Sequence, residues 1–169
     1  MKLRNRRDTI NVNGEEYTIL RVMRERRHFF CYVVTSQAMY LMKEFKDEEG
    51  YKGASDAYRK LQSLHIDSPR VITENICMRI IIQDYLSGVL ASEMIIRGEM
   101  DGAHINQVRE IAMAAERNGI SLDYFPGNFM VTKRGIVYVG DNIYEKNDSN
   151  TFDEVGMKYW MSECAPHHR

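Results

Sequence analysis

Apolar and β-branched residues gather in short runs over the first part of the chain. Three runs cover residues 18–23, 29–35 and 39–45, and turn signals stand before and between them at Asn13-Gly14 and Ser36-Gln37. Runs of this length and composition are typical of strands. Because they follow one another with short connections, they predict an antiparallel meander.

The spacing of apolar residues changes after the third run. Five of them repeat at helical intervals over residues 53–65, namely Ala54, Ala57, Tyr58, Leu61 and Leu64. This stripe predicts one amphipathic helix, which Ser68-Pro69 would end. Residues 71–72 and 78–83 then predict two more strands. We therefore expect residues 1–86 to form a first domain with a five-stranded antiparallel sheet and one helix.

Beyond Ser87-Gly88 the pattern has mainly helical period. It predicts helices over residues 89–97 and 104–118, with Gly119 where a helix favours a left-handed residue at its end. A loop at 121–128, strands at 129–132 and 136–140, and a helix at 152–162 follow. Thr151 and Glu154 form a capping-box pattern before that last helix. Residues 87–169 are thus expected to form a second, mostly helical domain, and the fold class is α+β.

Composition narrows the class of protein. The 169 residues are 44% hydrophobic and 28% charged, as in globular proteins, and the net charge of -1 argues against nucleic acid as a partner. Three separated cysteines without a CxxC pair argue against a disulfide framework or zinc site. We find no secretory signal and no apolar run near the ~20 residues that span a bilayer. The expectation is a cytoplasmic protein with no membrane partner.

Three polar residues have a spacing that predicts chemistry. Asp123 and Asn128 lie five residues apart before a strand, and Asp141 follows the next strand. A hairpin would bring Asn128 and Asp141 to the same end of the two strands. Their amide and carboxylate oxygens are hard ligands that suit Mg²⁺. Asp123 would lie nearby and could orient an attacking hydroxyl or accept its proton.

This order of residues resembles the protein-kinase superfamily over roughly residues 15–145. Asp123 matches the catalytic-loop Asp, while Asn128 and Asp141 match the two metal ligands. Lys43, on the third predicted strand, matches the lysine that contacts nucleotide phosphates. More narrowly, the chain is similar to small bacterial kinase-like proteins with a DYFPxNF pattern, a strand ending in Asp and an aromatic-rich end. The corresponding segments here are residues 123–129, 138–141 and 152–160.

The resemblance implies a protein-kinase-like fold with a reduced helical C-terminal lobe. It implies ATP and Mg²⁺ as cofactors, with ATP between the lobes and Asp84 and Leu86 contacting it at a hinge over residues 83–86. The implied activity is phosphoryl transfer. Only 28 residues follow Asp141, which favours a small-molecule hydroxyl over a protein as acceptor.

Departures from the kinase pattern leave other functions open. The turn at residues 24–29 contains arginines in place of glycines, the helix offers Asp56 where kinases carry Glu, and Asn142 follows Asp141. A pseudokinase, acting as a nucleotide-binding or regulatory interaction module, is therefore the alternative. A third hypothesis is an interaction protein that binds an acidic partner through Arg24, Arg26 and Arg27. A shortened second lobe would also leave apolar surface that a homo-oligomer could cover.

Overall fold

The computed structural model describes residues 3–161, with the side chain of Arg24 left out. The chain forms two compact units. The first unit contains the residues up to Tyr58 and Pro69–Leu86, and the second contains Arg59–Ser68 and the residues from Ser87 onward. Both units combine helices with antiparallel strands, so the predicted α+β class is confirmed.

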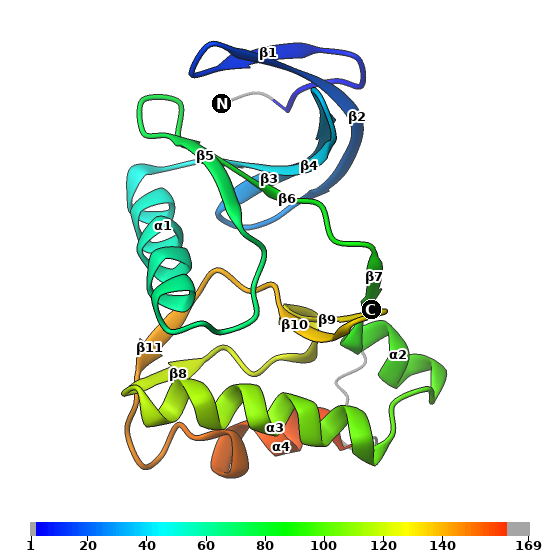
Figure 1. Ribbon diagram of the computed structural model, residues 1–169, viewed down its shortest axis with the longest axis vertical. Coiled ribbons are helices and arrows are strands. Elements are labelled where there is room, and N and C mark those ends of the chain that lie inside the picture. Colours follow the sequence, from blue (N-terminus) through cyan, green and yellow to red (C-terminus); the bar gives the residue numbers. More distant parts are fainter. Residues whose placement is uncertain (1–2, 162–169) are drawn as a thin grey trace. The chain divides into compact units, whose positions relative to one another are not determined.

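The first unit is built on a curled antiparallel sheet (Figure 1). Its strands lie in the order β1-β2-β3-β4-β6-β5. Their bounds are Thr9–Val12 (β1), Glu15–Glu25 (β2), Phe29–Thr35 (β3), Met39–Phe45 (β4), Val71–Asn75 (β5) and Ile80–Asp84 (β6). The prediction of five strands was thus wrong by one. It missed β1, although the Asn13-Gly14 turn that joins β1 to β2 was recognised.

That turn shows why the sixth strand exists. Asn13 and Gly14 both have positive φ, at 54° and 92°. Two-residue hairpin turns of this kind match the twist of paired strands and favour Asn-Gly. A strand must therefore precede Asn13 as well as follow Gly14. Only four residues long, with exposed and buried positions alternating, β1 is too short to stand out by its composition.

The two faces of the sheet in the first unit are covered differently. One face carries a buried apolar cluster in which Tyr17, Ile19, Tyr32, Met42 and Ile82 are fully enclosed. Side chains alternate between the faces of a strand. The residues next to Met42 and Ile82 therefore point to the other face, toward helix α1.

Helix α1 (Glu48–Ser63) begins five residues earlier than predicted. Gly50 and Gly53 made its first turns resemble a loop in the sequence. Asp47 starts the helix, because its Oδ1 accepts the Gly50 N–H at 2.7 Å. Glu48 and Glu49 follow in the first turn, where negative charge favours the helix dipole.

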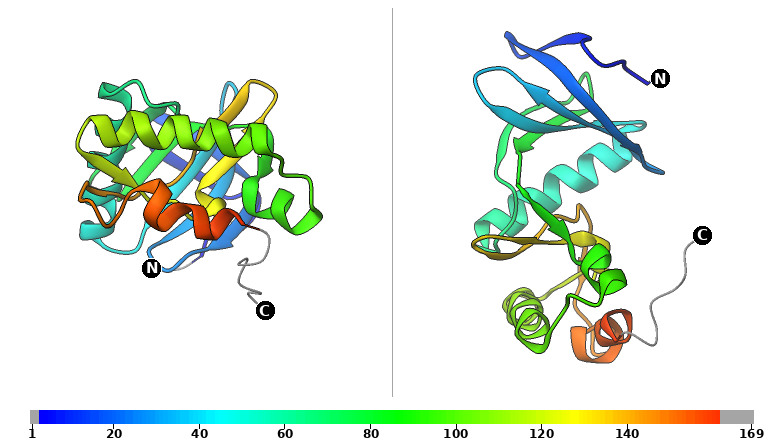
Figure 2. Two further views of the ribbon diagram at one scale, coloured as in Figure 1. Left: turned by 90° about the horizontal axis from the view of Figure 1, so that it is seen from below. Right: turned by 90° about the vertical axis from the view of Figure 1, so that its right-hand side faces the viewer.

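The second unit combines three α-helices with two small sheets (Figure 2). The helices are α2 (Ala91–Arg97), α3 (Gly102–Arg117) and α4 (Met157–Trp160). The strands are β7 (Gly88–Leu90), β8 (Ile120–Leu122), β9 (Phe129–Thr132), β10 (Gly135–Tyr138) and β11 (Ile143–Glu145). One sheet has the order β10-β9-β7 and the other pairs β11 with β8. The predicted helices and the two predicted strands are present, and the unit has three further strands, β7, β8 and β11, that were not predicted.

The predicted helix ends agree with the structure at α3 and differ at the last helix. Gly119 has φ 74°, as predicted for the residue after α3. The predicted helix at 152–162 divides into a π-helical turn, Phe152–Gly156, and the short α4. The Thr151 hydroxyl accepts the Glu154 N–H at 3.3 Å, which confirms the predicted cap. Residue 162, where that prediction ended, lies outside the described residues.

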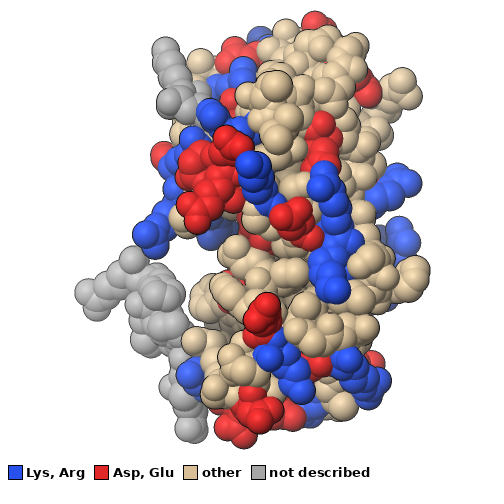
Figure 3. Space-filling view, turned by 90° about the vertical axis from the view of Figure 1, so that its left-hand side faces the viewer, with Lys and Arg blue, Asp and Glu red and all other residues tan. Residues whose placement is uncertain are grey.

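The described surface carries mixed charge. On the face drawn in Figure 3, Lys and Arg side chains are interspersed with Asp and Glu. None of the described helices has both the length and the apolar character to cross a membrane. Cys31 is partly buried, Cys77 is exposed, and Cys164 lies outside the described residues.

Candidate functional site

Asp123 and Asn128 lie on one compact loop of the second unit, between β8 and β9. The Asn128 backbone N–H donates to the Phe125 carbonyl at 2.9 Å, which closes the 3-10 turn Pro126–Asn128. Asn128 Nδ2 donates to the Asp123 carbonyl at 3.2 Å. Asp123 Oδ1 in turn accepts the Phe125 N–H at 3.3 Å. The two residues are therefore held together by the loop itself.

Two strand pairings bring Asp141 to the same place. The β9–β10 hairpin pairs Phe129 with Tyr138, and the Val139 N–H continues it by donating to the Asn128 carbonyl at 2.7 Å. Asp141 follows two residues later. The β11–β8 pairing then sets Ile143 opposite Leu122, directly before Asp123. The ends of two strand pairs thus converge on Asp123, Asn128 and Asp141.

Tyr138 links the segments that carry these residues. It is fully buried, its hydroxyl accepts the Asp123 N–H at 3.3 Å, and it donates to the Asn142 carbonyl at 2.6 Å. A Cβ on Gly140 would collide with this same hydroxyl. Glycine at position 140 therefore lets the chain pass close to Tyr138 on its way to Asp141.

Aromatic side chains pack against the loop that carries Asp123 and Asn128. Trp160 is buried, packs edge-on against Phe129 at 5.2 Å, and donates its indole N–H to the Tyr124 carbonyl at 2.8 Å. Tyr124 also packs against Phe152. Trp160 is therefore a core residue. The aromatic-rich end of the sequence thus holds the Asp123 loop in place.

The donor set of this loop fits Mg²⁺. Magnesium takes carboxylate and amide oxygens and keeps several waters, so few protein ligands suffice. The Asn128 amide donates through Nδ2 to the Asp123 carbonyl, which turns its Oδ1 in the other direction. Asn128 and Asp141 could therefore hold the ion, with Asp123 beside them. All three side chains are partly buried.

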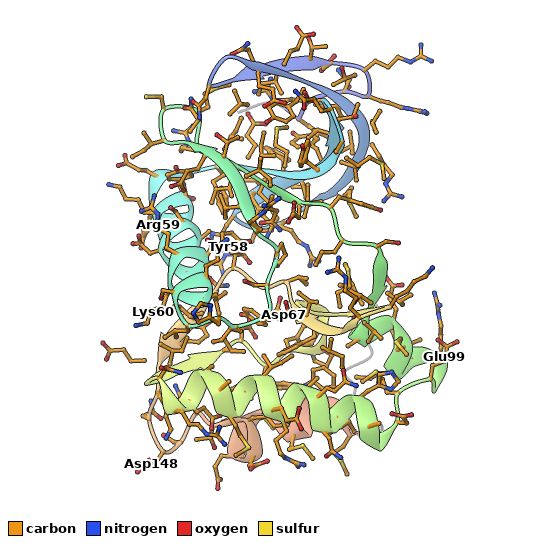
Figure 4. All side chains as sticks on the ribbon, viewed as in Figure 1. Tyr58, Arg59, Lys60, Asp67, Glu99 and Asp148 are labelled. Atoms are coloured by element: carbon orange, nitrogen blue, oxygen red, sulfur yellow. The ribbon has the colours of Figure 1, made fainter. Side chains whose placement is uncertain are left out.

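Lys43 lies in the first unit, on β4, and is only 4% exposed. Its Nζ donates to the Tyr58 hydroxyl at 2.6 Å and lies 4.9 Å from the centre of the Phe29 ring. Figure 4 shows Tyr58 on the opposite side of α1 from Arg59 and Lys60. Helix α1 therefore presents a phenol to the lysine.

Tyr58 is the contact that sequence reasoning missed. Asp56 is the acidic residue of this helix that was compared with the kinase Glu, but its side chain is exposed. Glu48, another acidic residue near the helix start, pairs with Lys52. Tyr58 had been recognised only as part of the apolar stripe of the helix. The tyrosine hydroxyl could have predicted this contact, because a buried tyrosine normally needs a hydrogen-bond partner.

The two predicted nucleotide contacts lie at the end of the sheet in the first unit. Asp84 closes β6, its backbone N–H donates to the Arg70 carbonyl at 2.9 Å, and its carboxylate lies 3.4 Å from Arg70 Nε. Leu86 follows and is partly buried. Gln83, just before them, is buried, and no described residue hydrogen-bonds its Oε1. A nucleotide contact by Asp84 and Leu86 stays a prediction.

Comparison with known proteins assigns no family. No protein-family model matches the chain. No curated protein has a significantly similar sequence. The functional argument therefore depends on the residues and geometry described above.

Proposed function

We propose that the protein is a kinase-like phosphotransferase that uses ATP and Mg²⁺. The observation that carries the proposal is the convergence of Asp123, Asn128 and Asp141 where β8, β9, β10 and β11 meet. A carboxylate for the acceptor, together with an amide and a second carboxylate for the metal, is the set that protein kinases use for phosphoryl transfer.

Each of these residues has a distinct role in the proposal. Asn128 and Asp141 hold the ion, which when bound neutralises charge on the transferred phosphoryl group. Asp123 orients the acceptor hydroxyl and takes its proton. Lys43 supplies a positive charge to the nucleotide phosphates. Most of the rate enhancement would come from positioning and charge stabilisation.

The order of elements supports a kinase-like fold. Strands β2, β3 and β4 precede α1, with the short β1 before them as a strand that the resemblance does not imply, and β5 and β6 follow the helix. Lys43 is on the strand directly before the helix, and its ammonium contacts Tyr58 of that helix. The loop with Asp123 and Asn128, a hairpin and Asp141 come later in the chain. This is the sequence of parts that the resemblance implies.

We further propose a small-molecule hydroxyl as acceptor. Residues soon after Asp141 pair with β8 as strand β11. The segment is therefore committed to the sheet of its own unit. A peptide acceptor would instead need an extended surface next to Asp123.

One observation favours a second candidate, a pseudokinase that binds nucleotide without transferring phosphate. The ammonium of Lys43 is enclosed by the Phe29 ring and the Tyr58 hydroxyl. Phe29 begins β3, directly after the arginine-rich turn that replaces a glycine-rich one. A phosphate would have to reach Lys43 past this ring.

Thermal-shift titration tests the proposal. ATP with Mg²⁺ should raise the melting temperature more than ATP alone, and Asp141→Asn should abolish the Mg²⁺-dependent part. Asp148→Asn is the matched control, because Asp148 is exposed on a different loop of the same unit (Figure 4). Absence of any Mg²⁺-dependent stabilisation in the wild type would refute the proposal.

Release of ADP separates the two candidates. A phosphotransferase should form ADP when candidate hydroxyl compounds are added, and Asp123→Asn should stop this while nucleotide still binds. Mg²⁺-dependent binding without ADP formation from any acceptor would favour the pseudokinase.

A further inference from the structure

Tyr144 is an exposed phenol beside the proposed site. It lies on β11, is 52% exposed and pairs with Ser121 on β8. Asp123 stands two residues beyond Ser121. Diagonal neighbours on antiparallel strands are about 7–8 Å apart, which aromatic side chains can bridge. The strand register therefore brings the Tyr144 side chain within reach of Asp123.

The charges around Tyr144 agree with this placement. Partial burial raises the pKa of the Tyr144 phenol, and the carboxylates of Asp123 and Asp141 raise it further. A tyrosine phenol is protonated at neutral pH, so the O–H has a proton to give.

The other hydroxyl groups around Asp123 are engaged. Tyr138 donates to the Asn142 carbonyl, and Ser121 donates to the Asn150 carbonyl at 2.5 Å. Tyr124 donates to Glu116 Oε1 at 2.7 Å. All three residues are buried. Tyr144 differs, because it is exposed and no described residue hydrogen-bonds its hydroxyl.

We propose that Tyr144 is an autophosphorylation site, modified within its own chain. The inference depends on the proposed phosphotransferase function and adds an acceptor to the small-molecule hydroxyl. Because Tyr144 is part of β11 itself, transfer to it needs no separate surface for a peptide. The phenol oxygen forms a bond to the γ-phosphorus of ATP, and the bond from that phosphorus to the β–γ bridging oxygen breaks. ADP leaves, and the phenol proton passes to the Asp123 carboxylate.

Intact-mass spectrometry of the full chain after incubation with ATP and Mg²⁺ tests the inference. The wild type should gain one phosphoryl group, and peptide mapping should locate it on Tyr144. Tyr144→Phe and Asp123→Asn should each reduce incorporation more than tenfold. Tyr40→Phe is the matched control, because Tyr40 belongs to the other unit and packs against Tyr17, and it should behave as the wild type does.

Four results would overturn the inference, and they are distinguishable. Phosphate on another residue, or Mg²⁺-dependent ATP binding with no phosphate on Tyr144, refutes it and leaves the proposed function standing. A rate per molecule that rises in proportion to protein concentration refutes transfer within one chain. No Mg²⁺-dependent ATP binding at all refutes the proposed function and the inference with it.

Discussion

Arg4 and Glu44 form a two-bond ion pair in the first unit. Arg4 Nε and Nη2 donate to the Glu44 carboxylate at 3.0 and 2.8 Å. Tyr32 joins them, since its hydroxyl accepts the Arg4 N–H at 3.2 Å and lies 3.4 Å from Glu44 Oε2. Glu44 is buried, so its charge depends on this arginine. The pair also fastens the start of the chain to β4.

Arg4→Ala should therefore destabilise the protein more than a surface substitution does. An uncompensated buried carboxylate typically costs 3–5 kcal/mol, and we expect about 3 kcal/mol because Arg4 is partly exposed. Urea denaturation measures the loss. Adding Glu44→Gln removes the stranded charge and should recover part of it. A double variant no more stable than Arg4→Ala would contradict this explanation.

Tyr58 contacts the Lys43 ammonium through its hydroxyl and through its ring, whose centre lies 5.3 Å away. Tyr58→Phe removes the acceptor of the 2.6 Å hydrogen bond and keeps the ring. Hydrogen bonds to charged groups are worth about 1.5–3 kcal/mol, so we expect a stability loss of about 2 kcal/mol in urea denaturation. Tyr40→Phe is the control, because Tyr40 lies on β4 like Lys43 but packs against Tyr17. Equal losses in the two variants would argue against a specific role for the Tyr58 hydroxyl.

At the scale of elements, the β9–β10 hairpin and the segment after it position the candidate metal ligands. The segment passes so close to Tyr138 that position 140 has no room for a side chain. Displacing Tyr138 would loosen its hydrogen bonds to Asp123 and Asn142. A change in the packing of this segment against Tyr138 would therefore also change the geometry of the candidate metal site.

Gly140→Ala should lower stability and weaken Mg²⁺-dependent ATP binding together. Overpacking of this kind costs about 1–3 kcal/mol. Gly53→Ala is the matched control: a Cβ at Gly53 meets nothing within 4 Å, and the residue lies inside α1. Gly53→Ala should stabilise the protein by about 0.5–1 kcal/mol. Thermal denaturation with and without ligand measures both effects, and an unchanged Gly140→Ala protein would contradict the packing argument.

Helix α3 begins with a cap that depends on pH. Asp101 Oδ1 accepts the His104 N–H at 2.9 Å, and this bond lowers the pKa of the Asp101 carboxyl. A lowered pKa in the folded state means that the charged form stabilises the fold. The contribution is present at neutral pH and is lost as the pH falls below the ordinary pKa of aspartate, about 4.

Asp101→Asn keeps a capping oxygen but removes the titration. Between pH 5 and pH 3 the stability of the wild type should therefore fall more steeply than that of the variant. Parallel urea denaturation series at several pH values measure the difference. Identical pH profiles would show that the cap does not titrate in this range.

At the scale of the whole molecule, each unit has its own core and its own share of the proposed chemistry. The first unit encloses an apolar cluster inside its curled sheet and carries Lys43 on the other face. The second unit packs aromatic rings of Phe129, Tyr138 and Trp160 beneath the loop of Asp123. The proposed function therefore assigns a phosphate-binding lysine to one unit and the metal ligands to the other.

Local patterns were sufficient for much of this architecture. The bounds of β3 and β4 agree with the prediction, because both strands are dense in apolar residues and end at turns. The hairpin that carries Asn128 toward Asp141 was also predicted, from the two neighbouring strands at 129–132 and 136–140. The three-residue strands β7, β8 and β11 were missed. Segments this short have no periodicity of their own and become strands only through the partner they pair with.

By itself, the sequence determined the α+β class, the order of the main elements and the spacing of Asp123, Asn128 and Asp141. These depend on residue type and separation along the chain. The tertiary structure decided which groups come together: Tyr58 bonds to Lys43, Tyr138 bonds to the Asp123 loop, and the charges of Asp123 and Asp141 act on Tyr144. Such contacts join residues 3 to 21 positions apart through strand register and packing, which no local pattern records.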